Sequence, residues 1–170
     1  RRTLLIVVAL TVVVAVGLAW LVAFSSVFGV SSYDIRGTRV LTTAQVRAAA
    51  GVAEGTPLVR VDTAAVTRRV ERLPVVASAE VSTSFPSTLV IRVTERQPVG
   101  FVRTSAGAVL VDRTGDQYRT VPTAPAALPR FVVPRGTDSR TTGGAVATVA
   151  AALPADLRRR VRSIEALDPQ

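Results

Sequence analysis

Residues 73–95 read LPVVASAEVSTSFPSTLVIRVTE, and this stretch decides the fold class. Apolar residues alternate with polar ones in both of its halves; the apolar members are Ala77, Ala79, Val81, Leu89, Ile91 and Val93. Alternation with a period of two is typical of a strand that buries one face. Residues 83–87 separate the two halves, and this is a normal length for a hairpin loop. The stretch therefore predicts an antiparallel hairpin.

A helix is predicted directly before the hairpin. Asp62 has a side chain suited to an N-cap, and Val66, Val70 and Leu73 share one helical face. Pro74 ends this helix, because the residue before a proline avoids helical angles.

A strand and another helix come earlier in the chain. Residues 30–36 alternate as a strand. Residues 42–45, TTAQ, form a Thr-x-x-Gln capping box, and Gly51 is a natural stop for the helix that follows. Residues 58–61 are predicted as a short extended piece. The order strand, helix, helix, strand, strand predicts a sheet with two helices over one face.

The region from residue 98 onward predicts a second, β-rich unit. Its expected strands are 99–103, 109–112, 117–121 and the beginning of one at 163–167. Residues 120–135 carry four prolines and are predicted as a loop. A helix is expected after Gly143 and Gly144; its apolar face is Val146, Val149, Ala150 and Leu153. A sheet that ends on a lone strand is unfinished, so we expect truncation at the C-terminus.

Residues 4–24 form 21 consecutive uncharged and mostly apolar positions. As a helix this run is about 31 Å long, which matches the roughly 30 Å hydrocarbon core of a bilayer. The run is longer than the apolar part of a signal peptide, and no small-residue cleavage site follows it. We therefore predict a transmembrane helix over residues 4–26. Arg1 and Arg2 flank it, and the next basic residue is Arg36, so the N-terminus is expected in the cytoplasm.

The composition excludes several chemistries. The 170 residues include no Cys, His or Met, which excludes disulfides, thiol nucleophiles, histidine bases and nearly all zinc, copper or haem sites. All 21 basic residues are Arg and 12 residues are acidic, a net charge of +9. If most of the chain lies on the outer side of the membrane, this positive charge does not indicate binding of nucleic acid. Aromatic residues are also not interleaved with the arginines as base stacking requires. The charge fits a solvated surface or, alternatively, attraction to anionic lipid or wall polymer.

No catalytic constellation is recognisable. Asp62 is better explained as a helix cap and Glu95 as a strand end, and a carboxylate pair would need a cleft that nothing implies. We therefore predict no enzyme, cofactor, metal site or small-molecule substrate. What remains is a protein-binding surface: the strand over residues 77–82 is a candidate sheet edge, whose backbone could accept a partner strand.

Seven motifs follow the apolar segment in order. They are YDIRG (33–37), QVR (45–47), GTPL (55–58), VD (61–62), LPVVASAEV (73–81), FPSTL (85–89) and VTERQP (93–98). Their order and spacing resemble the FtsQ/DivIB family of bacterial cell-division proteins. The segment LVD (110–112) with Gly115 is similar to the start of that family's β domain, and LPADLR (153–158) fits its actinobacterial branch.

The resemblance implies an α+β protein with one transmembrane helix and two external domains. Residues 1–3 are then a cytoplasmic stub, 4–26 the transmembrane helix, and 28–97 a POTRA domain with the order β-α-α-β-β. Residues 98–170 are the start of an antiparallel β domain with a helix, truncated at its C-terminus.

The resemblance also implies a function. Such proteins are non-enzymatic, single-pass scaffolds of the divisome, located in the cell membrane at the division septum. They link early and late division proteins, bind FtsB and FtsL, and help control septal peptidoglycan synthesis by the FtsW/FtsI pair. In the family, the POTRA domain serves recruitment, and its second strand and the turn after it correspond here to residues 78–83. The resemblance therefore implies four partner-contact residues, namely Ser78, Val81, Ser82 and Thr83. The main FtsB-binding surface of the family lies on strands near the end of the β domain. We expect those strands to be absent from residues 1–170.

Other functions stay open at this point. A POTRA-type chaperone or docking module of secretion or envelope assembly is one, although repeated POTRA units and ten-residue barrel strands are not visible. The anchor part of a membrane-bound cell-wall enzyme is another. A basic module that binds lipid or wall polymer is a third, and its binding would depend strongly on salt.

Overall fold

The structure is a computed structural model that describes residues 1–24, 28–132, 139–154, 157 and 160–166. The chain forms two compact units, Arg1–Glu95 and Arg96–Gln170. Each unit has its own set of buried apolar side chains. The first unit holds a three-stranded sheet and the second a five-stranded sheet.

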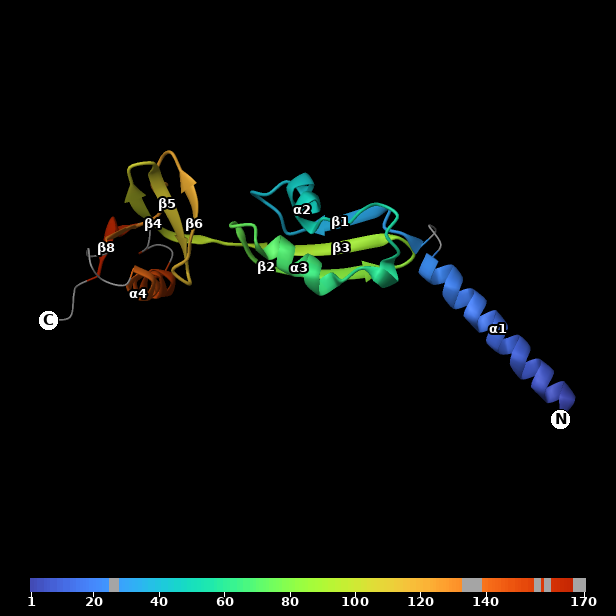
Figure 1. Ribbon diagram of the computed structural model, residues 1–170. Coiled ribbons are helices and arrows are strands. Elements are labelled where there is room, and N and C mark those ends of the chain that lie inside the picture. Colours follow the sequence, from blue (N-terminus) through green and yellow to red (C-terminus); the bar gives the residue numbers. More distant parts are fainter. Residues whose placement is uncertain (25–27, 133–138, 155–156, 158–159, 167–170) are drawn as a thin grey trace. The chain divides into compact units, whose positions relative to one another are not determined.

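The sheet of the first unit has the strand order β1-β3-β2 (Figure 1). Its strands are β1 (Ser32–Arg36), β2 (Val76–Ser84) and β3 (Thr88–Glu95). The central strand β3 pairs parallel with β1 and antiparallel with β2. Helices α2 (Thr43–Ala50) and α3 (Thr63–Glu71) lie between β1 and β2 in the chain. The predicted order of strand, helix, helix, strand, strand is confirmed, and β2 lies at an edge of the sheet.

The helix ends in this unit match their sequence signals. The Thr42 hydroxyl accepts the N–H of Gln45 at 3.2 Å, and the Gln45 carboxamide accepts the N–H of Thr42 at 2.9 Å, so the capping box is complete. Gly51 follows in the left-handed conformation with φ 58°. Asp62 caps α3 by accepting the N–H of Ala65 at 2.9 Å. These caps fix where the two helices begin.

The core of the first unit lies between the sheet and the two helices. Its fully buried members include Val66 and Val70 of α3 and Leu89, Ile91 and Val93 of β3, as their periodicity predicts. The half-buried Ala79 and Val81 of β2 pack against the same core. The odd-numbered side chains of β2 and β3 therefore point toward the helices.

Ala77 departs from the predicted alternation of β2. It is exposed, whereas the sequence placed it on the same face as Ala79 and Val81. The cause is a register shift between Val76 and Ser78, which pair with consecutive residues of β3. A β-bulge of this kind leaves one residue unpaired and turns it out of the alternation.

The predicted extended piece over residues 58–61 is also wrong. These residues form a short 3-10 helix, η2 (Leu58–Arg60). The N–H of Arg60 donates to the carbonyl of Pro57 at 2.9 Å, and the N–H of Val61 donates to that of Leu58 at 3.2 Å. Bonds to the third residue back are those of a 3-10 turn.

The sheet of the second unit has the order β6-β5-β4-β7-β8. Its strands are β4 (Pro98–Thr104), β5 (Gly107–Asp112), β6 (Gln117–Val121), β7 (Arg130–Val132) and β8 (Ser163–Glu165). Strands β4, β5 and β6 form the predicted antiparallel meander. However, β7 pairs parallel with β4, and β8 pairs parallel with β7. The expected antiparallel domain is thus a mixed sheet, because helix α4 (Ser139–Ala152) connects β7 to β8 as a crossover.

Two further predictions in the second unit need correction. Strand β7 lies inside residues 120–135, which their prolines predicted as a loop. The last strand is not alone, because β8 pairs with β7 over its whole length. A single-sequence pattern missed both because a three-residue strand is too short to show alternation.

Helix α4 begins at Ser139 and buries only part of the predicted stripe: Val146 and Ala150 are buried as predicted, and Val149 is not. Val146, Ala147 and Ala150 are buried, whereas Val149, predicted on the buried face, is 56% exposed. The buried stripe has helical spacing, but it is rotated relative to the most apolar face of the sequence. Packing against the sheet, rather than the apolar side chains alone, decides which face is covered.

Helix α1 (Arg2–Phe24) covers most of the predicted transmembrane segment. Its apolar side chains are exposed from Leu4 to Val16. Within the described residues, however, no helix reaches the length and apolar character that crossing a membrane requires. The transmembrane helix predicted over residues 4–26 is therefore not confirmed. Residues 25–26, and the side chains of residues 18, 19 and 21–24, lie outside the described part.

Candidate functional site

All four residues predicted to contact a partner lie on β2, at the edge of the three-stranded sheet. Ser78 and Ser82 are exposed, whereas Val81 and Thr83 are half-buried. The strand alternation thus divides the four residues into two pairs. Ser78 and Ser82 expose their side chains, whereas Val81 and Thr83 can offer a partner their backbone groups.

The outward backbone of β2 belongs to its odd-numbered residues. In an antiparallel ladder, successive residues direct their N–H and C=O groups alternately toward the neighbouring strand and away from it. The N–H of Ala79 donates to the Glu71 carboxylate of α3 at 3.2 Å, so Ala79 faces away from β3. By alternation, Val81 and Thr83 also direct their N–H and C=O groups outward. Among the described residues, no partner outside the β2–β3 pair hydrogen-bonds to these groups.

The hydrogen bonds at the start of β3 agree with this assignment. Ser31 and Ser32 donate their N–H groups to the carbonyl of Ser87 at 2.9 and 3.2 Å, so the odd-numbered positions here face β1. The even-numbered residues of β3 therefore face β2, in register with the even-numbered residues of that strand. Glu71 already binds the outward N–H of Ala79. The part of the β2 edge that could pair with another strand therefore begins at Val81.

The sheet face opposite the helices is polar and carries the side chains of the two serines. Glu80 lies on this face, 3.6 Å from Arg92. Arg36 binds Asp34 at 2.6 Å, and this hydrogen bond holds the pKa of Asp34 below its ordinary value. Exposed ion pairs of this kind contribute little to stability. The face is therefore a solvated surface whose side chains are available for contact.

Glu95 ties the loop before α2 to the far end of β3. Its carboxylate accepts the N–H groups of Arg39, Val40 and Leu41 at 2.8 to 3.0 Å. Burial alone would raise the pKa of Glu95, but the three backbone bonds and the charge of Arg39 hold that pKa below its ordinary value. The sequence predicted only a strand end here. The donors lie 54 to 56 positions earlier in the chain, so no local pattern could indicate them.

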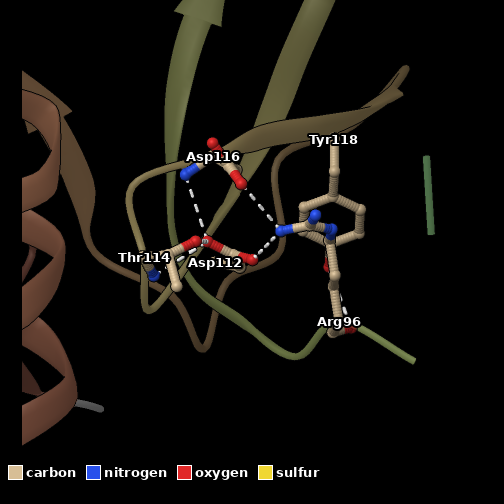
Figure 2. Close-up of polar contacts among 5 residues, drawn as sticks. All are labelled: Arg96, Asp112, Thr114, Asp116 and Tyr118. Atoms are coloured by element: carbon tan, nitrogen blue, oxygen red, sulfur yellow. Dashed lines mark hydrogen bonds and ion pairs between the residues drawn. The ribbon is translucent and has the colours of Figure 1, made fainter. Parts of the chain in front are cut away.

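A second polar cluster surrounds Asp112 in the other unit (Figure 2). One Asp112 oxygen accepts from the Thr114 hydroxyl at 2.6 Å and from the N–H groups of Thr114 and Asp116 at 2.9 and 3.1 Å. The other oxygen binds Nη1 of Arg96, which also lies 3.0 Å from Asp116. Asp112 is only 3% exposed. Burial would raise its pKa, but the bonds from Thr114 and Arg96 outweigh this effect and lower it.

The Asp112 cluster has the chemistry of a structural ion-pair network. Arg96 lies between two carboxylates and keeps both of them paired with a cation, which does not suit a general acid or base. The Tyr118 hydroxyl closes the cluster by donating to the Arg96 carbonyl at 3.4 Å. Within the described part of the chain, no group of three or more His, Cys, Asp or Glu residues could hold a metal ion. The edge of β2 is therefore the best candidate for a functional site.

Comparison with known proteins identifies the first unit. The family described as POTRA domain, FtsQ-type, matches residues 28–96. Those residues contain the three-stranded sheet and both helices that cover it.

Curated relatives extend the similarity beyond this region. The cell division protein FtsQ of Streptomyces collinus is 42% identical over 145 residues, which is 85% of this chain and 54% of the relative. FtsQ of Mycobacteroides abscessus is 36% identical over 165 residues, 97% of this chain and 53% of the relative. FtsQ of Streptomyces coelicolor is 41% identical over 129 residues, 75% and 49% respectively. The chain thus spans about half the length of these relatives, and the predicted resemblance is confirmed.

Proposed function

Because this chain belongs, through residues 28–96, to the family of FtsQ-type POTRA domains, we propose that it is a non-enzymatic scaffold of bacterial cell division. The relatives that support this proposal are named for cell division and carry no enzymatic designation. A scaffold acts through surfaces that bind other proteins. The described residues offer such a surface at the sheet edge.

The proposed location is the cell membrane at the division septum. Residues 4–26 anchor the chain, the N-terminus lies in the cytoplasm, and the remainder lies outside. Support comes from the 21 uncharged positions of residues 4–24 and from Arg1 and Arg2 at one end. The apolar side chains along α1 are exposed, so they need a cover other than this chain.

The proposed layout follows the two compact units. Residues 28–97 are the POTRA domain, and residues 98–170 are part of a β domain with a mixed sheet. The proposed partners are the division proteins FtsB and FtsL and, through them, the FtsW/FtsI synthase pair. We propose these partners for the full-length protein, because the relatives are about twice as long as this chain.

We assign recruitment to the edge of β2 by addition of a partner strand. The observation that carries this assignment is the outward backbone of Val81 and Thr83, which can pair with an extended segment. Ser78 and Ser82 contribute through side chains on the exposed face, where they select among strands of different sequence. Backbone pairing supplies affinity in such complexes, and side chains supply specificity.

The test replaces one outward N–H and leaves the β2–β3 ladder intact. Thr83→Pro removes that N–H, and proline is tolerated on edge strands when its nitrogen faces away from the sheet. Thr83→Val is the matched control, because it changes the side chain and keeps the N–H. Fluorescent fusions of the complete protein are imaged in dividing cells. We expect a midcell band for Thr83→Val and a loss of that band for Thr83→Pro.

The two variants must be equally abundant and equally folded for the comparison to hold. Immunoblotting of the fusions and circular dichroism of the purified chains establish this. Equal midcell bands in both variants would move the recruiting contact away from the β2 edge. A uniform membrane signal for the unmodified protein would reject the division scaffold itself.

A further inference from the structure

The segment after α1 is bound tightly to two loops that are distant in sequence. The N–H of Val30 donates to the carbonyl of Thr56 at 2.9 Å, and the N–H of Gly55 donates back to Val30 at 2.9 Å. Ser31 and Ser32 bind the carbonyl of Ser87 in the β2–β3 turn. Residues 28–32, 53–57 and 85–87 therefore form one end of the first unit, which we call the collar.

The backbone is closely packed within the collar. Gly29 forms a bridge with Pro57 and lies against Gly55. A Cβ on Gly29 would lie 2.6 Å from the carbonyl oxygen of Gly55, so no larger residue fits there without movement. The loops of the collar thus pack directly against Gly29 and Val30.

Large apolar side chains are exposed at this end of the unit. Phe85 is 57% exposed in the β2–β3 turn, and its ring contacts that of Phe28 edge-on with centroids 6.4 Å apart. Val59 is 52% exposed in η2, which directly follows the 53–57 loop, and the exposed Arg60 adjoins it. Exposed Phe and aliphatic side chains together with basic residues are typical of surfaces that bind the membrane interface.

The chain length keeps the collar near the end of α1. Four residue steps separate Phe24 from Phe28, and an extended chain spans at most about 3.6 Å per step, or about 14 Å in all. The headgroup layer on each side of a bilayer is about 6 Å thick. If α1 crosses the bilayer, Phe28 and the residues bound to it are held within reach of the lipid surface.

We propose that Phe28, Val59 and Phe85 dock the collar onto the bilayer surface, with Arg60 among the anionic headgroups. This proposal rests on the membrane anchor proposed above. The opposite end of the unit, where Val40 follows β1, then points away from the lipid. The eight residues of β3 separate the two ends by about 23 Å. Docking would present the β2 edge to partners at a defined height above the membrane.

The absence of Cys from the chain permits a direct test. Single-cysteine variants Val59→Cys and Phe85→Cys are labelled with an environment-sensitive fluorophore, and the whole chain is reconstituted into phosphatidylglycerol-containing vesicles with brominated acyl chains. Val40→Cys is the matched control, because Val40 is 49% exposed, in the same unit, and at the far end of the sheet. We expect about a twofold loss of emission at positions 59 and 85 and none at 40, since the bromines lie within a hydrocarbon core about 30 Å thick.

The sole tryptophan, Trp20, reports on the anchor independently. If the bromines quench Trp20 and leave both collar probes unquenched, the anchor stands and docking is wrong. If Trp20 is not quenched, the anchor fails and docking fails with it. Equal quenching at positions 40, 59 and 85 would also overturn docking, because it would mean that the whole unit lies on the lipid. Should Phe85→Cys fail to fold, Val59→Cys decides alone.

Discussion

The Glu95 carboxylate accepts backbone hydrogen bonds that the carbonyls of a helix or a strand would otherwise accept. The loop at residues 39–41 has three consecutive backbone N–H groups that no strand or helix pairs, and Glu95 accepts all three. Backbone donors that lose water need a partner, and an anion is a stronger acceptor than a carbonyl. This contact closes the end of the unit opposite to the collar.

Replacing Glu95 by Gln should therefore destabilise the first unit. We expect a loss of about 1–2 kcal/mol at neutral pH, because a neutral amide oxygen replaces a charged acceptor. The pKa of Glu95 is lowered on folding, so its contribution is present above about pH 4.5 and is lost as the pH falls through the lowered pKa. The difference in unfolding free energy between the natural chain and Glu95→Gln should shrink in acid. Amide hydrogen exchange at residues 39–41, compared between the natural chain and Glu95→Gln at neutral and acidic pH, measures this difference.

Glu80→Gln is the matched control for this experiment. Glu80 lies on the neighbouring strand with a side chain 74% exposed, and its ion pair with Arg92 is long, at 3.6 Å. Surface pairs of this kind contribute between nothing and about 1 kcal/mol. An equal loss of protection in both variants would mean that total charge, and not the three-donor contact, is what matters.

At the scale of elements, short polar signals determine where the helices begin. Helix α2 is only eight residues long, which is too short to be stable by propensity alone. Its start depends on the Thr42 capping box and its interior on the buried Val46 and Ala50. A defect in the cap should therefore be visible in the whole helix.

We expect Thr42→Ala to destabilise α2 by about 1 kcal/mol, because the N–H of Gln45 loses its acceptor. Thr43→Ala is the control: Thr43 is exposed and makes no cap, and alanine there should be neutral or slightly favourable. Hydrogen exchange across residues 45–51 compares the two. If both variants exchange alike, the cap contributes nothing beyond helix propensity.

At the scale of the whole molecule, the described residues of the two units bury separate sets of apolar side chains. The first unit has one cluster, with residues of β2, β3 and both helices; the second has two, one around Phe131 with residues of β4, β5 and α4 and one formed by Phe101, Ala108 and Leu110. The Asp112 cluster belongs entirely to the second unit. Damage to this cluster should therefore remain local.

Asp112→Asn tests this separation. The substitution places an amide against Arg96 and should cost about 1–3 kcal/mol, because the half-buried Arg96 loses the nearer of its two carboxylate partners. We expect faster hydrogen exchange in residues 96–132 and unchanged exchange in residues 30–95. Asp116→Asn is the milder control, since the Asp116 side chain is 52% exposed. Equal losses across both units would contradict two independent cores.

Much of the fold could be predicted because its signals are local. Capping residues, helical stripes and strand alternation each act over a few positions, and Thr42, Asp62 and Leu89 behaved as predicted. The candidate site was predicted in part: the strand was recognised as an edge, but its bulge at Ala77 was not. A bulge is a relation between two strands, so one strand's sequence does not indicate it.

The sequence by itself determined the order of the strands and α-helices in the first unit, the absence of Cys and His chemistry, and the family resemblance. Only the tertiary structure decided which backbone groups face outward on β2, which loops meet at the collar, and what Glu95 and Asp112 bind. The physical reason is range. Propensities and periodicities depend on neighbours in the chain, whereas edges, collars and ion-pair clusters depend on segments that meet only when the chain folds.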